Sequence, residues 1–370
     1  MTRVGLATLP LHSGAAPRWL FERMVRLSRA LVAALVEDLG PEGVLRRLAD
    51  PFWFQALGCL LGFDWHSSGV TTTVCAALKA GLRGLEREFG LVVAGGKGAA
   101  SRRTPEELRE AGARWGLDAD RLVHASRLAA KVDSNALQDG YRLYHHTFVA
   151  TLRGGWAVVQ QGMRPEDRTA RRYHWLGEAV SDFVCEPHAA VCCDTTGPCL
   201  NLVASESASA RQAITELARE RPAPLLRELA RLQASAGPGV LSLTMPRRHA
   251  VALADIDPRR LATALLQTYE AQAPTFEALL GLPGIGARTL RALALLSEVL
   301  AGTPLSWRDP TRFSFAHGGK DGHPFPVDRT TYDRTVAVLE DALRRARLGE
   351  PDRLRALRRL HTWVRAGGPG

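Results

Sequence analysis

Lysine is scarce in this chain of 370 residues, which has only four lysines and yet carries a net charge of +10. No apolar run reaches the roughly 18 residues that a membrane-spanning helix needs. The first residues also lack a basic segment followed by an apolar stretch and a cleavage site, as a secretory signal would have. From these absences we expect a protein with no membrane partner and a cytoplasmic location.

Paired cysteines are missing too. Of the six cysteines, four lie between Cys185 and Cys199, with His188 among them. Their spacing contains no CxxC pair and fits no zinc-finger pattern. We therefore do not expect structural zinc, and we expect the thiols to be reduced and buried as small apolar groups.

The excess of positive charge favours a polyanionic partner, most often nucleic acid. The alternative is that the arginines are ordinary surface cations. Composition leaves both interpretations open.

Hydrophobic periodicity divides the chain into two regions. Residues 144–152 and 156–163 are β-rich and are separated by Arg153, Gly154 and Gly155, which predicts a hairpin. From residue 257 onward every segment has a helical pattern, over 258–272, 275–282, 287–301, 329–346 and 350–364. We predict an α+β fold, with a catalytic region that contains a sheet with a hairpin over residues 1–236 and an all-helical helix-hairpin-helix domain that binds DNA over 237–370.

A helix-hairpin-helix is the strongest single motif, with two helical patterns joined by LPGIG at residues 282–286. Glycines let the backbone turn sharply, and the start of the second helix presents free N–H groups that suit a phosphate. Such contacts hold the DNA backbone without reading bases. A plain turn between two helices is the alternative. The predicted DNA contacts are Leu282, Gly284, Ile285, Gly286, Arg288, Thr289 and Arg291.

A second candidate backbone contact is the glycine-rich segment around Lys97, which is followed by Arg102 and Arg103. It lacks the GK[ST] ending of a P-loop. We interpret it as a basic loop that touches nucleic acid.

Residues suited to metal-assisted hydrolysis gather between positions 131 and 188. The predicted catalytic residues are Lys131, Asp133, Asp139, His145 and Gln161. The predicted metal ligands, for Mg²⁺ or Mn²⁺, are Asp133, Asp139, His146, Glu186 and His188. A divalent ion would polarise a phosphate oxygen and activate water, with an imidazole such as that of His145 as general base.

Other interpretations of this cluster stay open. His145 and His146 are neighbours on a predicted strand, so their side chains should point to opposite faces. Asp133 can instead cap a helix.

The loop that follows the helix-hairpin-helix offers a different chemistry. Pro326–Asp328 resembles the segment that supplies the catalytic aspartate in helix-hairpin-helix DNA glycosylases. Position 288 is arginine, whereas the lyase-active members carry lysine in this turn. Arginine stays protonated and cannot form a Schiff base.

Several runs along nearly the whole chain resemble DUF763, an archaeal and bacterial family of unknown function. They are LPLHSGAAPRWLFERM, FWFQALGCLLGFDWHSSGVTTTVC, AGGKG with SRRTPEEL, KVDSNALQDG, WAVVQQGM and FSFAHGGKDGHPFPVDRTTYD. The resemblance implies a common fold that includes a helix-hairpin-helix, and it implies a DNA nuclease. It assigns no catalytic residue.

The leading hypothesis is a metal-dependent DNA nuclease that acts on structured or damaged duplex or branched DNA. The alternatives are a glycosylase-like enzyme that uses Asp328 and a non-catalytic DNA-binding or repair scaffold. RNA as the substrate and a homodimer as the assembly are left open.

Overall fold

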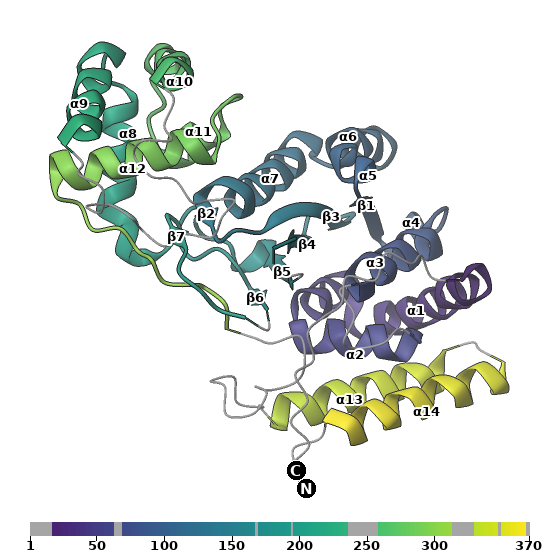
Figure 1. Cartoon of the computed structure of the whole chain (residues 1–370). Helices are drawn as coiled ribbons and strands as arrows, with labels where there is room; N and C mark the ends of the chain where they lie inside the picture. The colour runs from purple at the N-terminus through teal and green to yellow at the C-terminus, as the bar shows by residue number, and fades with distance from the viewer. Residues whose placement is uncertain are drawn as a thin grey trace, which may run out of the picture.

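The computed structural model describes residues 17–62, 69–166, 169–193, 195–235, 258–312, 329–346 and 349–367. Figure 1 shows a central sheet between helices. Asp328, the boundary near residue 237 and most of the loop after the predicted helix-hairpin-helix lie outside the described residues. No described helix has the length and apolar character needed to cross a membrane.

The first half of the chain is mostly helical up to the sheet. Its elements are α1 (Arg18–Ala49), α2 (Pro51–Leu61), α3 (Gly69–Leu82), α4 (Glu86–Phe89), β1 (Leu91–Lys97), α5 (Ala99–Arg102), α6 (Thr104–Trp115) and α7 (Ala119–Lys131). Helix α1 is kinked at Gly40, whose φ is 70°, and Pro41 follows this glycine. Asp50 caps α2 by accepting from the backbone N–H groups of Phe52 and Trp53.

The sheet follows α7 and a single π-helical turn, η1 (Val132–Ala136). The next elements are β2 (Leu137–Gln138), β3 (Arg142–Thr151), β4 (Trp156–Arg164), β5 (Thr169–Leu176), η2 (Gly177–Ala179), β6 (Ala190–Cys192) and β7 (Leu200–Asn201). Strands β1-β3-β4-β5-β6 form one antiparallel sheet in that order, and β2 pairs with β7. The predicted hairpin is confirmed as β3 and β4, which pair from Ala150 and Trp156 outward.

The remaining elements of the described chain are helices. They are η3 (Ser205–Ser207), α8 (Ala208–Ala218), α9 (Pro222–Ser235), α10 (Pro258–Ala271), α11 (Phe276–Gly281), α12 (Ala287–Ala301), α13 (Arg329–Arg345) and α14 (Glu350–Gly367). Residues 302–312 form an irregular segment after α12. The expectation of a mixed fold that contains both a sheet and many helices is confirmed.

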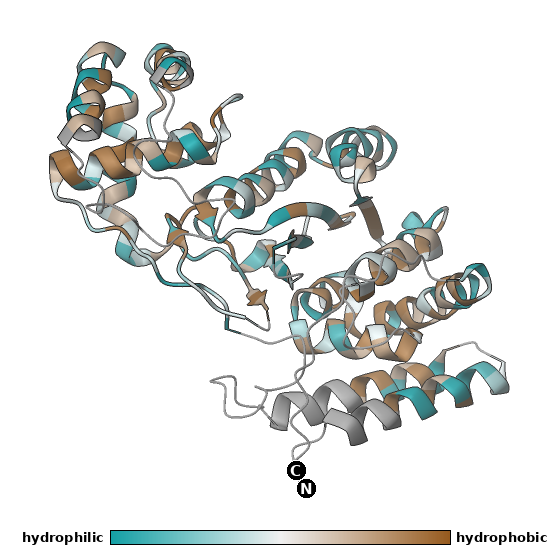
Figure 2. Ribbon diagram, viewed as in Figure 1, coloured by the Kyte–Doolittle hydropathy of each residue, from teal (hydrophilic) through white to brown (hydrophobic). Residues whose placement is uncertain are grey.

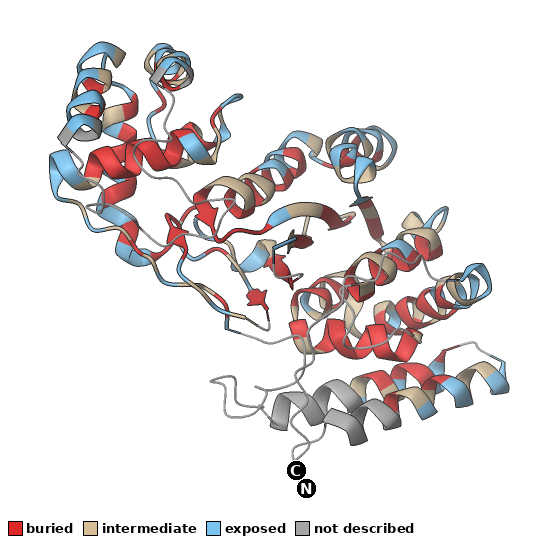
Figure 3. Cartoon of the chain, viewed as in Figure 1, coloured by how far each residue is buried: buried red, intermediate tan, exposed pale blue. Residues whose placement is uncertain are grey.

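Two hydrophobic cores lie on opposite faces of the sheet. On one face Val149, Ala157 and Val159 pack against α1, α2 and α3, and α13 and α14 close this core from outside. On the other face Phe148 and Val158 pack against the layer of α6 and α7, in a core that continues to α8, α11 and α12. Figures 2 and 3 show the result, with apolar, buried surfaces on α2, α3 and α12 and polar, exposed residues on the outer side of α14.

The glycine-rich segment before α5 is strand, which corrects the prediction of a phosphate-binding loop there. Gly95 and Gly96 lie in β1 opposite Thr147 and His146 of β3. The N–H of Gly95 donates to the carboxylate of Glu107. A Cβ at Gly95 would lie 2.2 Å from the carbonyl oxygen of His146, so close strand packing explains this glycine.

Candidate functional site

A buried carboxylate lies beneath the sheet layer at Asp133. It belongs to the π-helical turn η1, a type of turn that is frequent at functional sites. Its Oδ2 accepts from the side chains of Gln160 on β4 and Trp175 on β5, and its Oδ1 lies 2.5 Å from Nε2 of His188. Asp133 has no exposed surface. A carboxylate in this position fixes the imidazole of His188 in one orientation.

His188 connects this buried group to a cleft of about 320 Å³. The ring packs edge-on against Trp175, with centroids 4.7 Å apart, and its side chain is 7% exposed. Nδ1 of His188 has no hydrogen-bond partner among the described residues. If Nε2 carries the proton that Asp133 accepts, then Nδ1 offers a lone pair to a molecule in the cleft.

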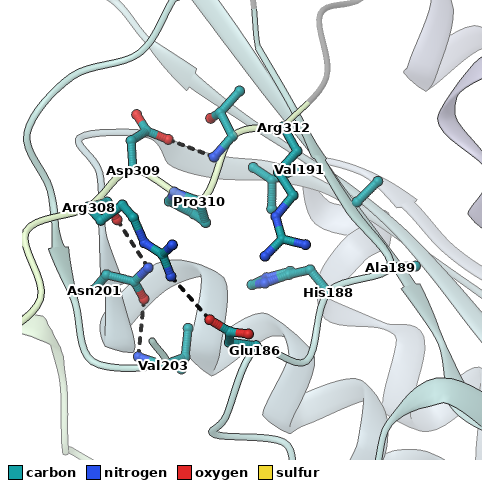
Figure 4. A pocket seen from close by; sticks show the side chains of 12 residues that line it. Glu186, His188, Ala189, Val191, Asn201, Val203, Arg308, Asp309, Pro310 and Arg312 are labelled. Atoms are coloured by element: carbon teal, nitrogen blue, oxygen red, sulfur yellow. Dashed lines mark hydrogen bonds and ion pairs between the residues drawn. The ribbon is translucent and has the colours of Figure 1, made fainter. Parts of the chain in front are cut away.

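The other wall of the cleft comes from residues 306–312, far along the chain from His188. This segment runs beside β7 and β6: Asn201 donates its backbone N–H to Ser306, and Arg312 donates its own to Val191. Figure 4 shows the side chains of Arg308 and Arg312 beside His188 and Glu186. The guanidinium of Arg312 gives the cleft a positive group that suits an anion, whereas Arg308 is paired with Glu186 and Glu206.

Glu186 lies at the same rim in an unusual backbone conformation. Its backbone φ is 44°, a value that residues other than glycine rarely adopt. Its backbone N–H donates to Val203 and its carboxylate pairs with Arg308 at 3.2 Å. Strained residues of this kind cluster at functional sites.

A buried charge cluster anchors the 306–312 segment to the sheet. Arg171 of β5 pairs with Asp139 at 3.0 Å and with Asp309 at 2.7 Å, and the Arg171 side chain is 1% exposed. Burial opposes ionisation of Asp309, but the charge and hydrogen bonds of Arg171 outweigh it and lower the pKa of this carboxyl. Asp309 therefore remains ionised and holds the cleft wall in place.

The structure separates the predicted catalytic residues between the two faces of the sheet. Asp133 lies on the face of η1, together with the predicted metal ligand His146, which bonds to both Gln160 and Ser126. His145 and Gln161 lie on the opposite face, towards α2 and α3, as the alternation along a strand requires. Burial, followed by the charges of His146 and Lys97, lowers the pKa of His145 to about 3. His145 is therefore neutral and too weak a base at neutral pH.

The predicted metal ligands do not meet at one point. Asp139 is paired with Arg171, both ring nitrogens of His146 are in hydrogen bonds, and Glu186 is paired with Arg308. Across the described part of the chain, no group of three His, Cys, Asp or Glu side chains has the arrangement of a metal site. These five residues, as placed, do not fit one metal ion, and only Asp133 and His188 contact each other.

The turn between α11 and α12 has both exposed and buried parts. Gly284, with φ of 75°, and Arg288 are exposed, whereas Ile285, Thr289 and Arg291 are buried. No side chain caps the start of α12, so its first N–H groups stay available. Figure 3 shows exposed residues at this turn, whereas α12, which follows the turn in the chain, is mostly buried.

The turn is connected to the element that carries Asp133. Lys131, two residues before that carboxylate, donates from Nζ to the carbonyl oxygen of Leu282. Gln138 donates to the carbonyl oxygen of Ala287 and accepts from Arg291. Lys131 and Arg291 are thereby engaged in holding the turn against η1 and β2.

Three of the predicted backbone contacts lie elsewhere. Lys97 ends β1 with its ammonium 5.9 Å from the centre of the Tyr144 ring, and Arg102 and Arg103 are exposed next to it. Among the residues of the cleft, Arg308 and Arg312 were not predicted. Their distance in sequence from His188 left no local signal.

A family model described as "Protein of unknown function (DUF763)" matches residues 5–327. No curated protein and no solved structure matches the chain.

Proposed function

The chain belongs to the DUF763 family, and we propose that this member binds DNA and hydrolyses its phosphodiester bonds in the cleft above His188. The observation that carries the proposal is the Asp133–His188 pair, a buried carboxylate that orients an imidazole at the floor of an arginine-rimmed cleft. Family membership supplies no activity of its own.

The positive rim would hold the phosphate. One guanidinium nitrogen of Arg308 pairs with Glu186 and Glu206, and the guanidinium of Arg312 lies beside His188 in the same cleft. Guanidinium groups match phosphate oxygens because of their planar, forked geometry. Bound in this way, the phosphorus atom would lie over the imidazole of His188.

The chemistry follows from that placement. Nδ1 of His188 takes a proton from a water molecule, and the water oxygen attacks phosphorus. The bond from phosphorus to one ester oxygen breaks, and that oxygen takes a proton from solvent. Asp133 stabilises the imidazolium that forms, while Arg308 and Arg312 stabilise the negative charge on the phosphate.

The turn between α11 and α12 would hold the duplex. Its available N–H groups and the exposed Arg288 suit a DNA phosphate, as the helix-hairpin-helix pattern predicts. Thr289 and Arg291 are buried and are left out of the proposed contact. Binding through these phosphate contacts would not depend on the base sequence of the DNA.

The test is a panel of end-labelled DNA substrates, including flaps, bubbles, single strands and abasic sites. Each substrate is incubated with the full chain, with Mn²⁺ or with EDTA. We expect at least one substrate to be cut, and we expect His188→Ala to abolish the cut while His124→Ala does not. His124 is an exposed histidine outside the cleft.

The alternatives give different results on the same panel. Binding without any cleavage would favour a DNA-binding scaffold. Base release without a strand cut would favour the glycosylase hypothesis at Asp328. The expected need for a divalent ion stays a prediction, which the EDTA arm tests.

A further inference from the structure

A second cleft, of about 300 Å³, lies where the start of α1 meets the end of α2 and the first half of α14. Its charged wall consists of Arg23, Arg26, Arg355 and Arg359, and Trp19 forms its edge. Figure 1 shows that α14 lies at the opposite end of the molecule from α11 and α12. This cleft is therefore separate from the proposed duplex-binding turn.

Among the described residues that line this cleft, arginines outnumber carboxylates. Asp352 is the one carboxylate among them, and it pairs with Arg355 at 2.6 Å. Burial, and next the charge of Arg355, lower the pKa of Arg359. The fold thus holds several like charges together, which repel one another unless an anion binds between them.

Trp19 adds a large aromatic surface to the charge. Trp19 is 59% exposed, the highest value among the exposed large hydrophobic residues of the described chain. The guanidinium of Arg23 lies 5.3 Å from the centre of the indole ring. An exposed indole beside arginines is the combination with which proteins bind single strands, because a base stacks on the ring while the phosphates follow the positive groove.

We propose that this cleft binds single-stranded nucleic acid, with a base on Trp19 and phosphates at Arg23 and Arg26. A recessed groove rimmed by guanidinium groups suits a phosphodiester chain better than it suits a flat lipid surface, which would meet a protruding apolar face. The site does not depend on the hydrolytic chemistry at His188. It would hold a displaced strand while the turn at Arg288 holds duplex.

Another arginine–tryptophan pair shows what distinguishes this cleft. Arg114 lies 4.9 Å from the ring centre of Trp115, but the lining around that pair also includes Glu86, Glu107 and Glu110. Carboxylates there balance the arginines. Arg114 is therefore a suitable control position.

The test measures the binding of a short fluorescein-labelled oligothymidylate to the full chain by anisotropy over a range of salt concentrations. Trp19→Ala should weaken binding about tenfold or more. Arg23→Ser/Arg26→Ser should weaken it and reduce the slope of log K against log salt by about 1.4. The matched control Arg18→Ser/Arg114→Ser removes the same charge outside the cleft and should change binding little.

Equal losses in the cleft variant and the control variant would overturn the proposal, because net charge alone would then explain binding. Unchanged oligothymidylate binding in Trp19→Ala would also overturn it. Retained binding of the oligonucleotide together with lost binding to vesicles of anionic lipid would assign the cleft to membranes instead. Duplex binding by these variants, measured in parallel, separates this result from the function proposed for the turn.

Discussion

Nε2 of His188 lies 2.5 Å from Oδ1 of Asp133, a carboxylate with no exposed surface that is 55 positions away in the sequence. Gln160 and Trp175 donate to the other oxygen of this carboxylate. Gln160 and Trp175 belong to β4 and β5, and His188 lies two residues before β6. The imidazole orientation is therefore set by the protein before any substrate binds.

Replacing Asp133 by asparagine tests that orientation. The amide can donate to the ring nitrogen and favour the wrong tautomer, and it cannot stabilise an imidazolium. We expect kcat on the cleaved substrate to fall by a factor on the order of 10² to 10⁴, with little change in DNA affinity. Circular dichroism and thermal unfolding serve as the control for folding. A variant that is folded and cuts at the wild-type rate would contradict the assignment.

Arg312 is expected to act on binding and on the reaction. Its guanidinium lies in the cleft beside His188, while its backbone N–H pairs with Val191 (Figure 4). Arg312→Ala should lower kcat/KM about tenfold to a thousandfold, as loss of one group that stabilises the reacting phosphate does. Arg312→Lys should recover only part of the lost kcat/KM, because an ammonium cannot donate two parallel hydrogen bonds to a phosphate as a guanidinium does. Arg353→Ala, outside the cleft lining, is the control.

Arg288 and Arg291 are one helical turn apart and should behave differently. Arg288 is exposed at the start of α12, so Arg288→Ala should weaken duplex binding and lower the salt dependence by about one unit of slope. Arg291 is 4% exposed and donates to Gln138. Arg291→Ala should lower the free energy of unfolding by about 1–3 kcal/mol, because the acceptor is left buried without a partner.

Gel shifts and chemical denaturation measure these two effects. If Arg291→Ala reduces duplex affinity at unchanged stability, the buried position described for this side chain does not hold in solution.

Asp309 should make stability depend on pH. Burial works against ionisation, but Arg171 lowers the pKa of Asp309 below its ordinary value. A carboxyl whose pKa is lower in the folded state contributes stability above the unfolded pKa of about 3.9, and this stability is lost as the pH falls through the folded pKa. Asp309→Asn should therefore lower the free energy of unfolding by about 1.5–3 kcal/mol at pH 7.

Urea denaturation at pH 7 and at pH 3 measures the difference. The difference in the free energy of unfolding between Asp309→Asn and wild type should be smaller at pH 3 than at pH 7. An equal difference at both pH values would show that the charge of Asp309 does not contribute to stability. Asp182→Asn is a control, since Asp182 is exposed and faces no arginine in a described ion pair.

Local patterns predicted the elements well. Alternating residues in Tyr144–Leu152 and the two glycines after Arg153 sufficed for the β3–β4 hairpin, because a strand pair and its turn are encoded in a few adjacent residues. The same alternation correctly placed His145 and His146 on opposite faces. It did not show that Gly95 lies in a strand, since close contact with the carbonyl of His146, and not a loop, requires that glycine.

The sequence names Asp133 and Asp139 as catalytic residues and metal ligands, and His188 as a metal ligand. A sequence shows that acids and imidazoles are near one another without showing their partners. In the structure Asp139 forms a buried ion pair with Arg171. Arg308 and Arg312 reach the cleft only because residues 306–312 return along β7 and β6, a long-range pairing with no local pattern.

The most direct measurement is chemical rescue of His188→Ala by added imidazole, with the substrate on which wild type is most active. If His188 supplies the general base, the variant is inactive alone, and imidazole restores cleavage in proportion to the concentration of its neutral form. Added imidazole does not change the rate at which His124→Ala cleaves the substrate. Wild-type cleavage by His188→Ala without imidazole would contradict the account.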